Sequence, residues 1–439
     1  MPRTPRRHAV LASASILAVI APATAVLAES PASAEPVTIE WWHLQNNDPG
    51  LTDWQNMADA FMAENPHVTI EITAQENDAF KPAIQAAVQA GDEPDLFQSW
   101  GGGVLLDQVE AGAVQDISEG VADTVDSFSP GATALYNLDG VQYGLPYNLS
   151  LVGMWYNVDL FTEAGITEPP TTWAGLLEVV QTLQDAGITP IAVGAGAQWP
   201  AHFWYSYLMI RIGGADVMTQ LAVDNNWEVP AVIEAGEHVA ELVAMEPFQD
   251  GYLGADWDTP DGEAGTFASQ GAAMDLQGQW ALGAYRNQAG LADSPEEPLP
   301  FEIGWFPFPE VEGGAGDPAD AFGGADGFVV GADAPAETVD FLNFITNVEN
   351  QRTFGISGTG IPANTEASSS VTEGPAPDGP VLETILETLN AAPFHQQFLD
   401  QFYTADVGTE VNLQSATLFA GESSPEEAAA AITAVAESG

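Results

Sequence analysis

Hydrophobic and polar positions alternate in short runs and then switch to helical spacing, and this switch repeats along the first hundred residues. Residues 37–42 alternate as a strand, residues 51–64 carry apolar side chains at helical spacing, and residues 68–72 alternate again. A further helix, capped by Asn77 or Asp78, follows, and a short buried strand comes after it. This order of strands and helices is typical of an α/β lobe with a largely parallel sheet.

The stretch from Asp95 to Gly103 is where we expect this first lobe to meet a ligand. Leu96 and Phe97 end a strand, and Trp100 is followed by three glycines and by a helix predicted for residues 104–111. In open α/β sheets, ligands lie beyond the carboxyl ends of the strands, and glycine lets backbone approach a ligand closely. Trp100 should therefore present its ring at this edge, although a core tryptophan beside a glycine turn would give the same pattern.

The rest of the chain predicts more helices and short strands. Asp139-Gly140 predicts a hairpin turn, and the apolar run 149–156 is expected to cross into a second lobe. Further elements are predicted, in chain order, as helix 173–186, strand 188–193, helices 201–212 and 230–245, strand 272–276, helix 279–287, strands 302–306 and 327–330, and helices 336–347 and 349–355. Residues 311–324 and 368–380 are expected to be loops, and Ser424-Pro425 predicts the start of a last helix.

Length and charge narrow the possible functions. A chain of 439 residues is too long for one core and suits two lobes, and 46% hydrophobic residues suffice to fill them. The chain has 63 acidic residues against 7 lysines and arginines, a formal charge of −56. Nucleic acid is excluded as a partner, and anionic solutes are disfavoured, because both need clustered basic side chains. A neutral or cationic ligand fits better, and the acidity itself indicates adaptation to high salt.

The first 34 residues predict an export signal. Arginines precede an apolar run at about 9–27, and cleavage is expected at 32–34, with 26–28 as the rival site. Arg6-Arg7 leaves the twin-arginine route open beside general secretion. The sequence has no cysteine, which excludes disulfides, thiol nucleophiles and cysteine-bound zinc, and its histidines lack metal-ligand spacing. No later run is long enough to span a membrane, so a soluble, exported protein is expected.

An ordered set of short motifs resembles one family. These motifs are Phe97–Gly103 with Val109–Gly112, Gly144–Asn148, Trp155–Asn157, Gly278–Trp280 and Gly360–Asn364. With them the chain resembles the extracellular solute-binding proteins of ATP-binding-cassette (ABC) importers, in the oligosaccharide branch (family 1). It is most similar to actinobacterial proteins for xylo- or cello-oligosaccharides, and the resemblance covers almost all of the mature chain.

The resemblance implies an α/β, two-lobed periplasmic-binding-protein-like fold of type II, each lobe having a mainly parallel sheet flanked by helices. With residues 1–34 as signal peptide, residues 35–146 plus 325–360 would form the first lobe. Residues 147–324 plus 361–439 would form the second. Hinge segments would connect the lobes and allow them to close over a neutral oligosaccharide.

The implied protein is a monomer without cofactor, metal or enzymatic activity, and its partners are the sugar and the permease subunits in the membrane. Closure is expected near residues 146–150, 325–330 and 360–364. One feature departs from the family. Many Gram-positive members carry a lipobox cysteine at the cleavage site, which this chain lacks. We expect an extracellular or periplasmic protein that is not anchored by that route.

Sugar recognition needs flat aromatic faces and polar groups that bind hydroxyls, and both occur at the predicted loop edges. The expected ligand-binding residues are Trp100, Trp199, Trp280, His43, Asn46, Glu76, Asn77, Asn148, His202 and Asp326. Core packing is the alternative for each tryptophan, and a helix cap or turn is the alternative for each polar residue. The tryptophans expected in the core are Trp41, Trp42, Trp54, Trp155 and Trp173.

Two other functions stay open. An exported glycoside hydrolase would need two carboxylates at a set separation, and among 63 acids such pairs arise by chance. A polyamine-binding transport protein would suit the charge, because acids and aromatic rings bind ammonium groups. Lys81, the only lysine, is expected to form a salt bridge or hydrogen bond within the first lobe.

Overall fold

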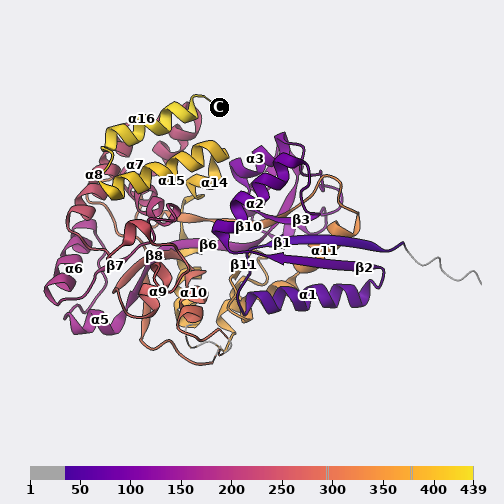
Figure 1. Ribbon diagram of the computed structural model, residues 1–439, viewed down its shortest axis with the longest axis horizontal. Coiled ribbons are helices and arrows are strands. Elements are labelled where there is room, and N and C mark those ends of the chain that lie inside the picture. The colour runs from indigo at the N-terminus through magenta and orange to yellow at the C-terminus, as the bar shows by residue number, and fades with distance from the viewer. Residues whose placement is uncertain (1–34, 293, 295, 376, 378, 439) are drawn as a thin grey trace, which may run out of the picture. The chain divides into compact units, whose positions relative to one another are not determined.

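Two long strands, β6 (Gly144–Asn157) and β10 (Ala321–Val330), lie antiparallel in the middle of the computed structural model (Figure 1). The structure describes residues 35–292, 294, 296–375, 377 and 379–438, so the predicted signal segment lies outside the described residues. Pro36–Gly439 forms one compact unit. β6 pairs with β10 from Gly144 to Leu151 and with two other strands beyond Leu151, so that one strand serves both halves of the sheet.

The sheet is mixed, and its order is β2-β1-β3-β10-β6-β8-β7. Its strands other than β6 and β10 are β1 (Val37–His43), β2 (Val68–Ala74), β3 (Leu96–Ser99), β7 (Ile191–Ala192), β8 (Met274–Gly278), β9 (Ile303–Phe306), β11 (Ile361–Pro362) and β12 (His395–Gln396). β4 (Asn137–Leu138) and β5 (Val141–Gln142) pair in a separate two-stranded sheet. β1 is parallel to β2 and β3, and β7 is parallel to β8. β10 runs antiparallel to β3, and β6 runs antiparallel to β8 and β9. The predicted α/β sheet is present, but parallel pairing dominates only in the first half, because β6 and β10 cross the sheet in opposite directions.

Helices cover both faces of this sheet (Figure 1). They are α1 (Gly50–Glu64), α2 (Asn77–Ala90), α3 (Gly102–Glu110), α4 (Pro130–Ala134), α5 (Val158–Glu163), α6 (Trp173–Asp185), α7 (Trp199–Asp224), α8 (Pro230–Ala244), α9 (Glu263–Ala268), α10 (Ala281–Gln288), α11 (Glu337–Ile345), α12 (Val348–Ile356), α13 (Gly379–Ala391), α14 (Leu399–Phe402), α15 (Ala405–Ala420) and α16 (Pro425–Ala436). In the first half, α1 and α11 pack on one face of β1–β3, and α2 and α3 pack on the other.

The buried apolar side chains separate into a large cluster built mainly from residues 151–322 and 361–436 and two smaller clusters built mainly from residues 39–147 and 328–354. Aromatic edge-to-face contacts stabilise one smaller cluster: the Trp41 ring lies 5.3 Å from Trp54 and 5.1 Å from Phe341. Each such pair adds about 0.5–1.5 kcal/mol beyond the burial of its area. The predicted lobe boundaries lie at 146, 324 and 360. They remain a proposal, and Tyr147 and Ala363 pack in one of the two smaller clusters.

Local sequence signals explain where several elements begin. The last helix, α16, begins where Ser424-Pro425 predicted it, and Ser424 and Glu427 form a capping box there, each side chain accepting from the other's backbone N–H. The Asp139-Gly140 turn has φ values of 52° and 88°, as a tight hairpin requires. The cap of α2 was predicted one or two residues late, because Glu76 is the N-cap and its side chain accepts from Asp78 N–H.

Other predictions of local structure were wrong. α7 is much longer than the predicted helix 201–212 and includes a non-helical break at Gly214, where φ is 66°. Residues 321–324, expected to be loop, belong to β10. The stretch 368–380 contains a turn of 3₁₀ helix with buried Ser370 and Val371 and the start of α13. Helices α13, α14 and α15 had not been predicted.

Candidate functional site

The two smaller apolar clusters mark the first half of the molecule, and the large cluster marks the second half. A cavity of about 200 Å³, here called the first cavity, lies at the junction of these two halves. Its walls come from the loop after β1, the start of α2, strands β3, β6 and β10, and, in the second half, the starts of α7 and α10 and the segment before α14. Typical ligand clefts measure roughly 300–1,000 Å³, so this cavity is small. Its position between two separately packed cores makes its size sensitive to movement of one half against the other.

Aromatic rings form much of the wall. Trp199, at the start of α7, lies 5.5 Å from the Trp257 ring and 5.3 Å from Phe203. Phe398 stacks on Phe203 at 5.3 Å, and the ring of Trp280 lies 5.8 Å from Phe398. These rings belong to the second half and form a continuous apolar surface.

Trp100 comes from the first half, beyond the carboxyl end of β3, and also lines the first cavity. Only 6% of its surface is exposed, and Phe80 contacts its ring at 6.0 Å. The sequence had suggested that the glycines after Trp100 leave space for a ligand, but Gly101 and Gly103 do not. A Cβ at Gly101, whose φ is 68°, would lie 2.5 Å from the carbonyl oxygen of Leu135, and one at Gly103 would overlap the backbone of Tyr403. The glycines therefore let the backbone after Trp100 pack closely against Leu135 and Tyr403.

Asn148 on β6 and Asp326 on β10 bring polar groups to the cavity from the two central strands. Asn148 Nδ2 donates to Asp326 Oδ2 over 2.9 Å, and Asn148 Oδ1 accepts from the backbone N–H of Ile361 over 2.9 Å. Burial raises the pKa of Asp326 to about 6, although the hydrogen bond from Asn148 and the charge of Lys81 act in the other direction. These contacts tie β6, β10 and β11 together at the place where the chain was predicted to cross between lobes.

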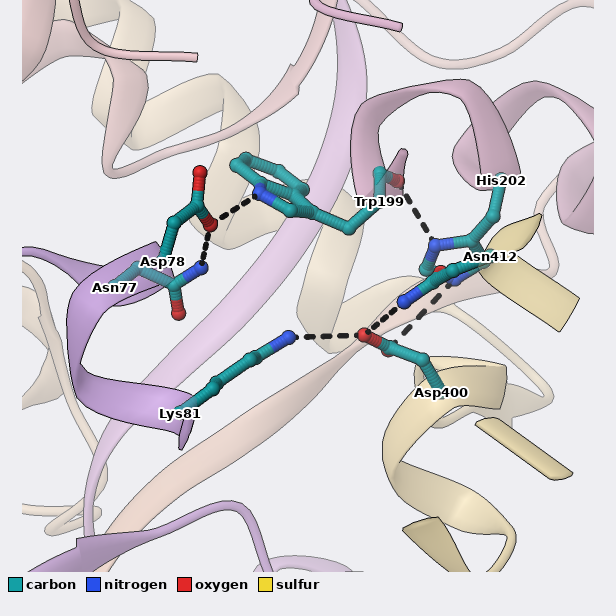
Figure 2. A network of polar contacts seen from close by, with 7 residues as sticks. All are labelled: Asn77, Asp78, Lys81, Trp199, His202, Asp400 and Asn412. Atoms are coloured by element: carbon teal, nitrogen blue, oxygen red, sulfur yellow. Dashed lines mark hydrogen bonds and ion pairs between the residues drawn. The ribbon is translucent and has the colours of Figure 1, made fainter. Parts of the chain in front are cut away.

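Figure 2 shows two of the polar contacts that join the first half directly to the second. Lys81 Nζ on α2 lies 3.0 Å from Asp400 Oδ2 on α14, and Trp199 Nε1 donates to Asp78 Oδ1 over 3.1 Å. Burial opposes ionisation of Asp400, but the charge of Lys81 and hydrogen bonds hold its pKa below the ordinary value. Lys81 was expected to pair within the first lobe. That prediction was wrong, because its partner lies 319 positions further along the chain on the second half.

The first cavity brings together eight of the ten predicted ligand-binding residues: Trp100, Trp199, Trp280, Asn46, Glu76, Asn77, Asn148 and Asp326. Their contact with a ligand stays a prediction. His43 and His202 do not line the cavity, and both are fully buried. His43 packs against Trp41 at 4.6 Å, because β1 alternates and places both residues on its core face. His202 Nδ1 donates to the carbonyl of Trp199 over 2.8 Å, one helical turn behind the cavity wall.

Burial lowers the pKa of His43 to about 3 and that of His202 to about 4, so both rings are neutral at pH 7. His202 Nε2 lies 3.9 Å from Asp400 Oδ1, so this histidine packs behind a residue that lines the first cavity. In residues 35–438, apart from those whose placement is not described, no group of three acidic or histidine side chains is arranged to hold a metal ion.

Sequence reasoning missed several residues of the wall. The residues of the wall that were not predicted are Phe203, Trp257, Asp258, Phe398, Asp400 and Gln401. Phe203 follows Trp199 by four positions on α7, so helical spacing gave a signal for it. Phe398, Asp400 and Gln401 lie in a segment for which no element was predicted, and no comparable spacing points to them.

Two separately packed halves, joined by strands that run through both, and a cavity with walls from each define a protein that encloses a small solute. The chain belongs to the bacterial extracellular solute-binding proteins, whose family model matches residues 48–352. The predicted family and the two-lobed α/β fold are confirmed. None of the helices in the described part of the chain is long and apolar enough to cross a membrane.

Individual relatives agree with this family. An uncharacterised ABC transporter extracellular-binding protein of Pyrococcus horikoshii is 24% identical over 400 residues, which cover 87% of this chain and 84% of that protein. A maltotriose-binding protein of Pyrococcus abyssi is 27% identical over 263 residues, which cover 59% of this chain and 52% of that protein.

Solved structures share the fold. One, from work on xylan utilisation by the thermophilic bacterium Caldanaerobius polysaccharolyticus, has a TM-score of 0.79 and 26% identity, covering 90% of this chain and 99% of that chain. A chitin oligosaccharide binding protein has a TM-score of 0.81 and 23% identity, covering 92% of this chain and 98% of that chain.

Proposed function

We propose that this protein, once exported, binds a neutral oligosaccharide in the first cavity and delivers it to the membrane permease of an ABC importer. The observation that carries the proposal is the combination of tryptophan faces with amide and carboxylate side chains on one cavity wall. A sugar ring offers an apolar C–H face and a ring of hydroxyls, which these two kinds of group suit. Lys81 is the only basic residue among the described residues of the wall, so an anionic ligand would lack an arginine fork.

The sugar is of the xylo- or cello-oligosaccharide type. The motifs of the sequence favour this type, and so does the similarity to the structure from the work on xylan utilisation. Other relatives are described as binding maltotriose or chitin oligosaccharides, so a ligand panel must include those sugars as well.

The sugar docks on one lobe, and the other lobe closes over it. The hinge lies near residues 146–150, 325–330 and 360–364, where hydrogen bonds of Asn148 link three strands. A sugar that contacts Trp100 from the first lobe and Trp199 from the second stabilises the closed state, and the permease recognises that state. The protein acts as a monomer, needs no cofactor and leaves the sugar unchanged.

A polyamine is the second candidate ligand. Glu76 of the first lobe and Asp258 of the second line the same cavity, beside Trp199 and Trp257. Burial raises the pKa of Glu76, and the charges of Asp78 and Asp258 add to this effect. An ammonium group between these carboxylates would relieve the repulsion and contact the rings through cation–π interactions.

Tryptophan fluorescence distinguishes these candidates. The mature protein would be titrated in high salt with xylobiose, cellobiose, maltotriose, chitobiose and spermidine, and each sugar would then be analysed for cleavage by chromatography. We expect a saturable change with a xylo- or cello-oligosaccharide and intact sugar afterwards. A response to spermidine alone would replace the sugar by a polyamine, and cleaved sugar would show that the protein is a hydrolase.

A further inference from the structure

A second cavity, of about 490 Å³, adjoins the first. Four residues line both cavities, namely Lys81, Trp100, Asp400 and Gln401. The second cavity lies between α2 and α3 of the first lobe and α14 and α15 of the second. It is more than twice as large as the first cavity, and it too has walls from both lobes.

The wall of the second cavity suits hydroxyl groups. Its polar side chains include the amides Gln85, Gln89, Gln401 and Asn412 and the hydroxyls of Thr404 and Thr409. Asn412 Oδ1 is buried yet has no hydrogen-bond partner among the described residues, although Asn412 Nδ2 donates to Asp400 Oδ2 over 3.2 Å. A buried acceptor without a donor is costly, and a ligand hydroxyl would satisfy it.

Both residues of the Lys81–Asp400 ion pair, which Figure 2 shows, line both cavities, so the pair lies where the cavities meet. Asp400 is held in place, because its side chain is only 5% exposed and accepts from Asn412 as well as from Lys81. Lys81 is 32% exposed, and its Nζ lies 5.3 Å from the centre of the Trp100 ring. Lys81 is therefore the movable half of the pair, since its long flexible side chain can turn into solvent. A ligand would then cover the Trp100 ring in its place.

We infer that the two cavities are parts of one elongated saccharide site and that the Lys81–Asp400 pair divides them. A short saccharide occupies the first cavity and leaves the pair intact. A longer one displaces Lys81, passes along the face of Trp100 and places its further sugar units against Thr409 and Asn412. This inference rests on the proposed function and adds that the pair determines how the protein responds to saccharide length.

Binding of xylo-oligosaccharides of two, four and six units, measured by calorimetry, tests the inference, with the cello series in parallel. We expect the tetraose to bind about tenfold or more tightly than the disaccharide, as one or two additional hydrogen bonds would give. Thr409→Trp, at an exposed position of α15, should fill the second cavity. It should remove this advantage of length and leave the affinity for the disaccharide within about twofold.

The double variant Lys81→Gln/Asp400→Asn tests the ion pair itself, because it removes both charges and leaves no unpaired one. The ratio of tetraose to disaccharide affinity should rise several-fold, since only the longer ligand has to open the pair. Arg352→Gln is the matched control: it removes the ion pair with Glu373, and neither residue lines the first or the second cavity. That control should leave the ratio unchanged.

The outcomes separate the inference from the proposed function. If disaccharide and tetraose bind wild-type protein equally, or if Thr409→Trp keeps the advantage of length, the second cavity is not part of the site. If the double variant leaves the ratio unchanged, the ion pair does not divide the site. If no saccharide of any length binds, the proposed function fails, and the inference fails with it.

Discussion

Replacing Asp275 by asparagine should stabilise the protein at neutral pH. Asp275 on β8 is fully buried and accepts from the hydroxyl of Tyr285 over 2.8 Å. Beside it, the buried Glu263 accepts from the backbone N–H of Gly194 over 2.6 Å and from Gln277 Nε2 over 2.8 Å. Burial raises the pKa of both carboxyl groups, and in Glu263 the charge of Asp275 raises it further.

The expected size of the effect follows from the pKa of Asp275, which burial raises from 3.8 to about 6. A shift of about two units corresponds to about 3 kcal/mol. Between pH 4 and pH 6 the folded protein holds a proton on this group that the unfolded chain has released. The free energy of unfolding therefore falls as pH rises through this window, and the whole penalty is present above it. Asparagine carries no charge and can still accept from Tyr285.

Urea unfolding of Asp275→Asn and wild type at pH values from 4 to 8, at fixed high salt, measures the effect. The variant should be more stable than wild type by up to about 3 kcal/mol at pH 7.5 and by little at pH 4. His43 and His202, whose pKa values burial lowers, contribute the opposite slope in both proteins, so only the difference between the proteins is interpreted. Asp92→Asn, at an exposed position, is the control. A difference that does not change with pH, or a less stable variant at pH 7.5, would refute the reasoning.

Three further changes test the site and the packing around it. Trp199→Ala removes a ring from the first cavity and the hydrogen bond to Asp78, so calorimetry should show about 10- to 100-fold weaker binding of the saccharide that wild type binds best. Unchanged affinity would show that Trp199 does not contact the saccharide. Asp326, with a pKa of about 6, should lose its charge as pH falls from 7 to 5. This loss should weaken saccharide binding about five- to tenfold in wild type and not in Asp326→Asn. Equal pH profiles of binding in the two proteins would contradict this. Gly153→Ala would place a methyl group into the Trp305 ring and should cost about 1–3 kcal/mol in urea unfolding, whereas an unchanged midpoint would show that the ring can move aside.

The elements that could be predicted from the sequence are those with a one-sided pattern. β1 alternates and α1 has a single apolar face, so both were placed to within one residue at each end. α7 was predicted too short, because residues 199–214 are buried on all sides and show no helical period. The alternation in β1 could have corrected the prediction that His43 binds the ligand. His43 lies on the same face of the strand as the buried Ile39 and Trp41.

The site was predictable where it depends on strand ends and not where it depends on distant partners. Trp100 and Asp326 follow from strands and crossings that the local sequence indicates. The partner of Lys81 is 319 positions away, and the glycines after Trp100 accommodate Leu135 and Tyr403 instead of a ligand. Nothing in the local sequence identifies such pairs, because they arise only when the second lobe packs against the first.

A crystal structure of the mature protein with a xylo- or cello-tetraose tests most directly whether one neutral saccharide binds between the lobes. We predict sugar rings against Trp199 and Trp280, hydroxyls bonded to Asn148 and Asp326, and contact with Trp100 from the opposite lobe. A saccharide bound outside the first cavity, or contacting one lobe only, would contradict the proposed function.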